Sequence, residues 1–293
     1  MAGDPSSEGR EEKQRIAGIF DRAAGTYDQL GPRFFVRFGT RLAELADVGP
    51  GQHVLDVACG RGASLFAAAE RVGPLGHVVG VDLAESMVAE IDRESRLRGL
   101  RNIEALVMDG EELAFPDDAF DRVLAGFCLF FFPRWERALA EMLRVLKPGG
   151  RLGLSTWGEV DPDWRWLEEL IDSYLADPDD DSAQADDKVD FTERPDEMRT
   201  VVLRAGFARA EVIAEAREST YTDVDEWWAT QWTHGVRGAL EQIEARLGPS
   251  GLARFEADAR RQLQTMRPPE SGAIRHVMPV LYTLADKAES HIH

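Results

Sequence analysis

The stretch that most constrains the fold covers residues 53–70, where an apolar strand pattern meets a glycine turn and a run of helix formers. Leu55 and Val57 are typical of a strand that is covered on both faces. Gly60 and Gly62 let the backbone turn sharply and approach a ligand closely. The residues that follow favour a helix, so the turn is predicted to end at a helix N-terminus. This order predicts a nucleotide-binding unit of strand, turn and helix.

The neighbouring residues indicate which nucleotide such a unit would hold. The dinucleotide fingerprint would have a glycine where this chain has Leu65, and the Gly-Lys-Ser/Thr ending of a phosphate loop is absent. Asp56 ends the strand and would repel a phosphate at short range, which favours a cationic ligand. Asp82 ends the next predicted strand, residues 77–82, where a carboxylate accepts both ribose hydroxyls. Adenosine joined to a positively charged amino acid describes S-adenosylmethionine.

Four segments in a fixed order then resemble the class I S-adenosylmethionine-dependent methyltransferases, in particular the branch of ubiquinone and menaquinone biosynthesis. They are Leu55-Asp-Val-Ala-Cys-Gly-Arg-Gly, Gly80-Val-Asp-Leu-Ala-Glu-Ser-Met, Asp109-Gly-Glu-Glu-Leu-Ala-Phe-Pro-Asp and Leu143-Arg-Val-Leu-Lys-Pro-Gly-Gly-Arg-Leu. The resemblance is strong over residues 15–157. It implies an α/β fold with a Rossmann-like seven-stranded sheet, mostly parallel with an antiparallel last strand. Helices would cover both faces, and a helical cap would be added.

The resemblance also implies a set of cofactor contacts. Leu83 and Met87 would flank the adenine ring, although ordinary helix-to-sheet packing is the alternative for Met87. Asp109 would accept from the adenine amino group. Tyr27 would help to close the site, or would simply pack a helical lid onto the core. The predicted cofactor-binding residues are Tyr27, Asp56, Ala58, Gly60, Gly62, Asp82, Leu83, Met87, Asp109, Gly110, Glu111 and Phe127.

The turn after the predicted strand at 120–126 bears on the acceptor. Nucleic-acid amino-methyltransferases carry an Asn/Asp-Pro-Pro-Tyr/Phe tetrapeptide there, which is absent, and Cys128 lacks the preceding proline of cytosine C5 enzymes. Phe127 is predicted to lie between the methyl donor and the acceptor. Phe131 and Phe132 are predicted to be core residues.

Composition limits the partners. The chain has 53 acidic against 34 basic residues in 293, a formal net charge of −19, which disfavours nucleic acid and anionic membranes. Cys59 and Cys128, the only cysteines, fall in predicted core elements, so we expect no disulfide framework. We expect no signal peptide, and the sequence has no apolar run of about 18 residues. We expect a cytoplasmic protein that acts on a small molecule; a homodimer is compatible with the sequence.

The predicted organisation has five parts. Residues 1–13 are expected to be a disordered tail and 14–50 an N-terminal helical lid. The S-adenosylmethionine-binding core would cover 51–220 and 272–287, with Pro279 marking a bulge or sheet edge in the last strand. Residues 158–192 would form a second, partly mobile insert, whose aspartates lack calcium-loop spacing, so no metal site is expected. Residues 221–271 would form a helical cap that selects the substrate.

Three residues of this cap are candidates for the substrate pocket. Trp228 and Trp232 would supply aromatic walls and His234 a general base, in a pocket that also includes Phe127. The alternative is that Trp228 and Trp232, four residues apart, pack one helix face onto the domain.

The sequence therefore predicts an S-adenosylmethionine-dependent methyltransferase that yields S-adenosylhomocysteine. It would methylate oxygen or carbon of a small molecule in quinone-like or specialised natural-product biosynthesis. Such transfer mainly needs alignment of the acceptor and exclusion of water, so no catalytic triad is expected. One alternative is a non-methylating enzyme that uses the cofactor site for cyclisation or rearrangement. Another is a regulatory or scaffold protein with a vestigial site.

Overall fold

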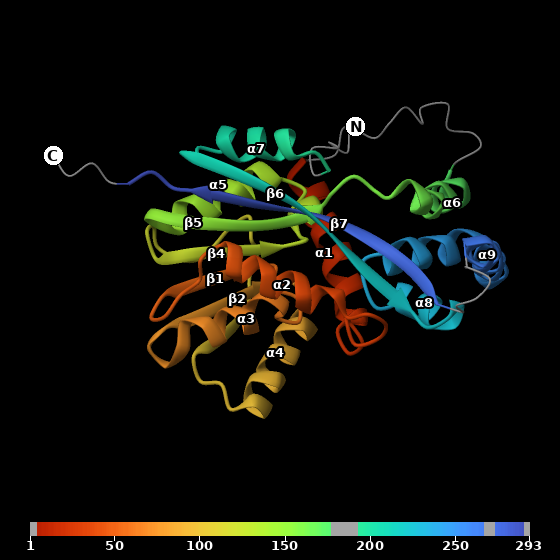
Figure 1. Cartoon of the computed structure of the whole chain (residues 1–293), viewed down its shortest axis with the longest axis horizontal. Helices are drawn as coiled ribbons and strands as arrows, with labels where there is room; N and C mark the ends of the chain where they lie inside the picture. The colour runs from red at the N-terminus through yellow and green to blue at the C-terminus, as the bar shows by residue number, and fades with distance from the viewer. Residues whose placement is uncertain (1–4, 177–192, 267–272, 290–293) are drawn as a thin grey trace.

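A computed structural model of the chain describes residues 5–176, 193–266 and 273–289, and shows one central sheet with helices on both faces and a helical cap at one end (Figure 1). The strand order is β3-β2-β1-β4-β5-β7-β6. β7 runs antiparallel to both of its neighbours, and the other pairings are parallel. The seven-stranded, mostly parallel fold is therefore confirmed. The strands are β1 (His53–Val57), β2 (His77–Asp82), β3 (Ile103–Val107), β4 (Phe120–Gly126), β5 (Leu146–Trp157), β6 (Arg209–Tyr221) and β7 (Ile274–Asp286).

Alternate side chains of each inner strand feed two separate apolar layers. On β1, Val54 packs with one layer while Leu55 and Val57 pack with the other. The first layer is covered by α2 (Phe34–Leu45), α3 (Ala63–Val72) and α4 (Glu85–Arg98), and the second by α5 (Trp135–Val145) and α7 (Pro195–Arg204). Burial on both faces explains the nearly unbroken apolar runs of these strands. Short 3-10 turns lie at Gly73–Leu75, Leu129–Phe131 and Pro162–Trp164.

The last strand is antiparallel as predicted, but its predicted edge position is wrong. β7 lies between β5 and β6, and β6 forms the edge. β6 carries charges along its length, which suits an exposed edge, whereas β7 is mostly apolar and buried. The carbonyl of Pro279 accepts from the Gly158 N–H, just past the end of β5. The N–H that proline lacks would point to the same side, where β5 does not continue, so Pro279 is tolerated at this position.

The cap has its own apolar core, built around Trp227, Phe255 and Leu240. Its helices are α6 (Trp166–Leu175), α8 (Val224–Gln231) and α9 (Arg237–Met266), and α9 is kinked at Gly248. A short turn after Gln231 separates α8 from α9. Side-chain hydrogen bonds from Gln231 and Thr233 to backbone carbonyls, followed by Gly235, favour a turn there. The acidic segment 177–190 lies outside the described residues.

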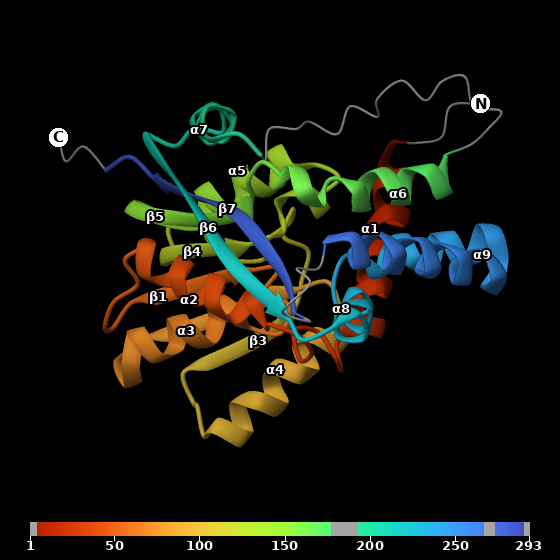
Figure 2. The same cartoon turned by 45° about the vertical axis from the view of Figure 1, so that its right-hand side comes forward.

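The N-terminal segment differs from the expected disordered tail. α1 (Pro5–Ala23) is a continuous helix that lies between the sheet and the cap helices (Figure 2). The charged stretch before Gln14 gives no apolar signal of its own. It is held by tertiary ion pairs of Lys13 with Asp109 and Glu111.

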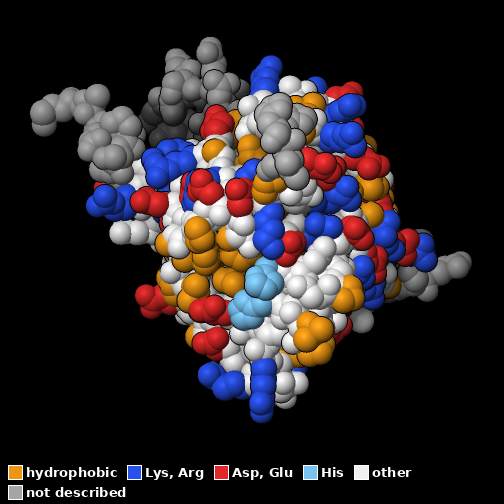
Figure 3. Space-filling view, turned by 90° about the vertical axis from the view of Figure 1, so that its left-hand side faces the viewer, with side chains coloured by type: hydrophobic (Ala, Val, Ile, Leu, Met, Phe, Trp, Pro, Cys, Tyr) orange, Lys and Arg blue, Asp and Glu red, His pale blue; other side chains and the backbone are white. Residues whose placement is uncertain are grey.

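The end of the molecule opposite the cap shows acidic and basic side chains interspersed, with a small histidine patch (Figure 3). His53 and His77 begin β1 and β2 and pair in register, which places both away from the C-terminal strand ends. No helix in the described ranges is long and apolar enough to cross a membrane. Within those ranges, no three His, Cys, Asp or Glu side chains group as metal ligands.

Candidate functional site

Two adjoining cavities lie at the C-terminal ends of the parallel strands, where ligands bind in open α/β sheets. Cavity 1 has a volume of about 330 Å³ and cavity 2 about 90 Å³. Both are lined by Tyr27, Ala58, Gly60, Gly126 and Phe127, so the cavities form neighbouring parts of one site.

The glycine turn between β1 and α3 forms the floor shared by the cavities. Gly60 has φ 52°, and a Cβ placed on it would meet nothing within 4 Å, so the backbone faces open space. Gly62 has φ 82°, and a Cβ there would come within 2.8 Å of the Phe66 ring. Ala58 also has a positive φ of 50°, an unfavourable conformation for a residue with a Cβ. Such local strain is concentrated at functional sites in proteins.

Asp82 is anchored to the floor by two backbone groups. The Gly60 N–H donates to Oδ2 of Asp82 (2.8 Å), and the Ala84 N–H donates to Oδ1 (2.9 Å). Burial raises the pKa of this carboxyl, while the two N–H donors act in the opposite direction. A carboxylate has about four acceptor positions, so its remaining lone pairs are available in cavity 2, which Asp82 lines. A carboxylate with acceptor positions beside the open surface of Gly60 would suit the vicinal hydroxyls of a ribose.

Asp56 is placed differently from the prediction. Its side chain is fully buried and lines neither cavity, because alternate β1 residues point under α3. Ser64 Oγ donates to Oδ2 of Asp56 (2.7 Å), and Ser64 itself lines cavity 1. Burial raises the pKa of Asp56 to about 7, outweighing the Ser64 hydrogen bond. Direct contact between Asp56 and a ligand in either cavity is therefore not supported, and its link to cavity 1 is the hydrogen bond from Ser64.

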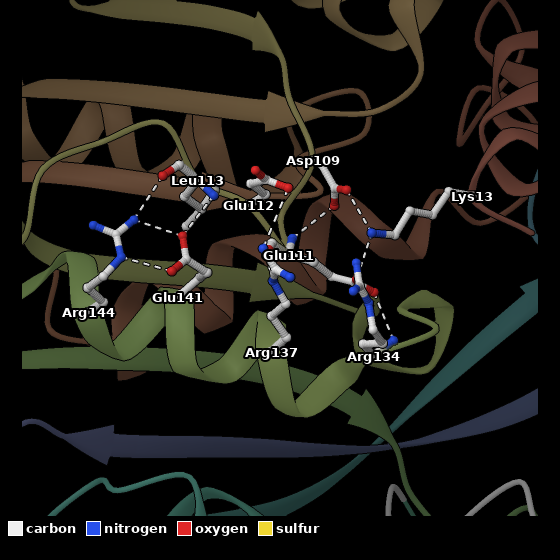
Figure 4. Close-up of polar contacts among 9 residues, drawn as sticks. All are labelled: Lys13, Asp109, Glu111, Glu112, Leu113, Arg134, Arg137, Glu141 and Arg144. Atoms are coloured by element: carbon white, nitrogen blue, oxygen red, sulfur yellow. Dashed lines mark hydrogen bonds and ion pairs between the residues drawn. The ribbon is translucent and has the colours of Figure 1, made fainter. Parts of the chain in front are cut away.

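The third acidic segment lies at the far end of cavity 2. Gly110 lines the cavity, whereas Asp109 and Glu111 do not line it and instead bind Lys13 (Figure 4). Oδ1 of Asp109 accepts from the Glu111 N–H (2.9 Å). The Glu111 side chain is fully buried and also accepts from the backbone N–H and Nε of Arg134. The predicted adenine end is thus a compact ionic cluster.

Of the predicted cofactor residues, eight line the cavities. These are Tyr27, Ala58, Gly60, Gly62, Asp82, Leu83, Gly110 and Phe127. Met87 does not line them: it is fully buried against Ala24 and Ala84, which agrees with the packing alternative.

Phe127 occupies the centre of an aromatic group. Its φ is 51°, and its N–H donates to the Ser155 carbonyl (2.8 Å), which fixes the strained turn after β4. The Phe127 ring lies 4.2 Å from the Trp157 ring and 5.5 Å from the Phe35 ring, measured between centroids. Phe35 in turn stacks on Tyr27 at 5.3 Å. Tyr27, Phe35 and Phe127 give cavity 1 an aromatic wall.

The predicted substrate residues of the cap are not brought to either cavity. Trp228 packs edge-on against Trp232 and lies beside Phe255 in the cap core, which supports the packing alternative. His234 lies beside Phe34, with ring centroids 6.0 Å apart, and lines neither cavity. Burial lowers the pKa of His234 to about 4. The geometry therefore does not support a pocket role for these three residues.

Sequence reasoning missed one wall of cavity 2. Lys13, Ile16, Ala17 and Phe20 form it from a single face of α1. Phe131 and Phe132, predicted as core residues, also line cavity 2, and Phe131 packs edge-on against Phe20. The i, i+3, i+4, i+7 spacing of the α1 residues was the available signal, but it does not say what the face covers.

Comparisons with known proteins agree with this geometry. A family model described as a methyltransferase domain matches residues 54–150. Aklanonic acid methyltransferase DauC of Streptomyces sp. (strain C5) is 42% identical over 144 residues, covering 49% of this chain and 66% of that protein. Nocamycin O-methyltransferase of Saccharothrix syringae is 47% identical over 144 residues, covering 49% of this chain and 51% of that protein.

A third relative is matched over more of its length. Demethylmenaquinone methyltransferase of Listeria welshimeri is 34% identical over 174 residues, which cover 58% of this chain and 73% of that protein. The matches to the two natural-product enzymes, by contrast, span just under two thirds and about half of those proteins. Residues 54–150, which the family model matches, hold the glycine turn and the acidic strand ends described above. The chain belongs to the class I S-adenosylmethionine-dependent methyltransferases.

Proposed function

We propose that this chain binds S-adenosylmethionine across cavities 1 and 2 and transfers its methyl group to oxygen or carbon of a small molecule. The observation that carries the proposal is Asp82, whose carboxylate is fixed by the Gly60 and Ala84 N–H groups while free acceptor positions face cavity 2. Gly110 and Leu83 line the same cavity, where the base would lie. The methionine part would extend past Gly60 into cavity 1.

When bound, the cofactor supplies an activated methyl group on a sulfonium. The chain's own residues would hold the reactants and exclude water. Buried Asp56, below Ser64, would place negative charge under the floor of cavity 1 when it is ionised, and a cationic ligand would favour that ionised form. The strained turn at Phe127 and the ring of Tyr27 shield the junction of the two cavities.

The acceptor class follows from the cavity wall. Tyr27, Phe35 and Phe127 line cavity 1 with aromatic side chains, which suits a planar aromatic or enolic molecule. Two of the relatives are named for natural products and one for a menaquinone precursor. We therefore propose an acceptor from quinone-like or specialised natural-product chemistry.

Calorimetry and product analysis test this function. The purified chain is titrated with S-adenosylmethionine and with S-adenosylhomocysteine, and is then incubated with a panel of phenols, enols and carboxylic acids. The expected result is saturable binding of both nucleosides and a mass gain of one methyl on at least one acceptor, with an equal amount of S-adenosylhomocysteine formed. Failure to bind either nucleoside would contradict the proposal. An acceptor converted to an isomer of unchanged mass would instead indicate the cyclisation alternative.

A further inference from the structure

One face of α1 forms a wall of cavity 2. Lys13, Ile16, Ala17 and Phe20 line it from one side, while Asp82, Leu83, Met108 and Gly110 line it from the ends of β2 and β3. Figure 2 shows α1 lying between the sheet and the cap helices. A ligand whose base lies between these walls is therefore covered by α1.

Lys13 secures this helix at the predicted adenine end. Its Nζ lies 2.7 Å from Oδ2 of Asp109 and 2.5 Å from Oε2 of Glu111 (Figure 4). The Lys13 side chain is 12% exposed and that of Glu111 is fully buried. Hydrogen bonds between ionised groups in such partly buried surroundings are stronger than those of surface ion pairs.

The opposite end of α1 is held by more exposed contacts. Arg22 pairs with Glu241 of α9, but the Arg22 side chain is 51% exposed. Asp21 accepts from the Ser86 N–H at the start of α4. These contacts dock α1 on the cap and on α4 at a distance along the helix from the Lys13 cluster, so the two ends of α1 can be tested separately.

We propose that the ion pairs of Lys13 hold α1 over the cofactor base, and that the breaking of these ion pairs controls how fast S-adenosylhomocysteine leaves. This inference rests on the proposed function. Gly110, which lines cavity 2, lies between the two carboxylates that bind Lys13, so the base and the ion pairs of Lys13 would lie at the same short segment. Lys13 lines cavity 2 as well, so a base bound there would lie against α1, and the bound base and the closed helix would stabilise each other.

The kinetic test uses S-adenosylhomocysteine as the probe. Lys13→Met keeps the aliphatic stem and removes the cation, and Arg22→Met is the matched control, because it breaks the other ion pair between α1 and a different element. Lys13→Met should release the nucleoside roughly tenfold faster in a stopped-flow displacement experiment, and Arg22→Met should stay within about twofold of the unmodified chain. Unchanged release from Lys13→Met, or an equal acceleration by Arg22→Met, would overturn the proposal.

Hydrogen exchange gives a second readout that needs no ligand. In the ligand-free protein, amides at residues 14–23 should exchange faster in Lys13→Met than in the unmodified chain, while amides of β1 and β4 keep their protection. Equal exchange at residues 14–23 in the two proteins would overturn the proposed role of Lys13, even if the nucleoside binds normally. If the unmodified chain bound no nucleoside, the proposed function would fail, and faster exchange at 14–23 would still show that Lys13 holds α1.

Discussion

Ser64 Oγ donates a 2.7 Å hydrogen bond to Oδ2 of Asp56 below the floor of cavity 1, and among the described residues Oδ1 of Asp56 has no hydrogen-bond partner. The carboxylate is fully buried, so its charged form is only partly compensated. This pair joins the end of β1 to the first turn of α3. It places a buried, incompletely compensated carboxylate directly beside the predicted methionine position.

The first prediction concerns Asp56→Asn and the pH dependence of stability. Burial raises the folded-state pKa of Asp56 to about 7, above its unfolded value of about 3.9. The stability contributed by this group is therefore fully present below about pH 4 and is lost as the pH rises through about 7. Urea unfolding at pH 5 and pH 8 should show this loss in the unmodified chain, and Asp56→Asn should reduce it by on the order of 3 kcal/mol.

Asp92→Asn is the control for this measurement. Asp92 is exposed on α4, so its replacement also removes one carboxyl group but does not alter a buried one. The difference in unfolding free energy between pH 5 and pH 8 should be the same for Asp92→Asn as for the unmodified chain. An equal effect of both substitutions would show that net charge, and not burial of Asp56, governs the pH dependence.

The second prediction concerns the backbone at Ala58. Its φ of 50° costs about 1–2 kcal/mol for a residue with a Cβ, whereas glycine adopts it freely. Ala58→Gly should therefore raise the free energy of unfolding by about 0.5–1 kcal/mol after the added freedom of the unfolded chain is subtracted. Chemical denaturation measures this, and Ala89→Gly, at an exposed helical position in α4, should lower stability by about 1 kcal/mol. A loss of stability in both variants would contradict the strain at Ala58.

The inner strands could be predicted from the sequence because their pattern is local. β2 and β4 have the predicted bounds, 77–82 and 120–126, since apolar runs there end in Asp82 and Gly126. Gly60 and Gly62 identify the turn because few other residues adopt its backbone conformation. Asp82 then follows from its place at the end of β2.

The role of the first turns of α1 and the packing of the cap could not be predicted from local sequence patterns. Lys13 contacts Asp109 from 96 residues away, so its role depends on tertiary structure and not on a local pattern. Trp228 and Trp232 have the spacing of a helix face, and this spacing does not distinguish a pocket wall from the interior of a cap. The direction of Asp56 could in principle follow from β-strand alternation, because Val54 and Asp56 share a face of β1.

The third prediction revises the role expected for His234. Because its ring lies beside Phe34 and lines neither cavity, His234→Gln should leave the affinity for S-adenosylhomocysteine unchanged and lower kcat by less than about tenfold. Loss of a general base would cost about 10²- to 10⁴-fold. Steady-state kinetics with an acceptor found in the panel measures kcat. A hundredfold fall with unchanged nucleoside affinity would restore His234 as the base.

The fourth prediction concerns Asp82→Ala, which should weaken S-adenosylhomocysteine binding about a hundredfold. The substitution removes the acceptor predicted for the ribose hydroxyls, and hydrogen bonds to a charged group contribute about 1.5–3 kcal/mol each. It also leaves the Gly60 N–H, which donates to Asp82 at 2.8 Å, without that acceptor, so the glycine turn loses a restraint. Calorimetric titration of both proteins measures the change. Asp92→Ala on the exposed side of α4 serves as the control and should bind normally. If Asp82→Ala bound the nucleoside as tightly as the unmodified chain, the ribose would have to lie elsewhere, and the placement of the cofactor across cavities 1 and 2 would be wrong.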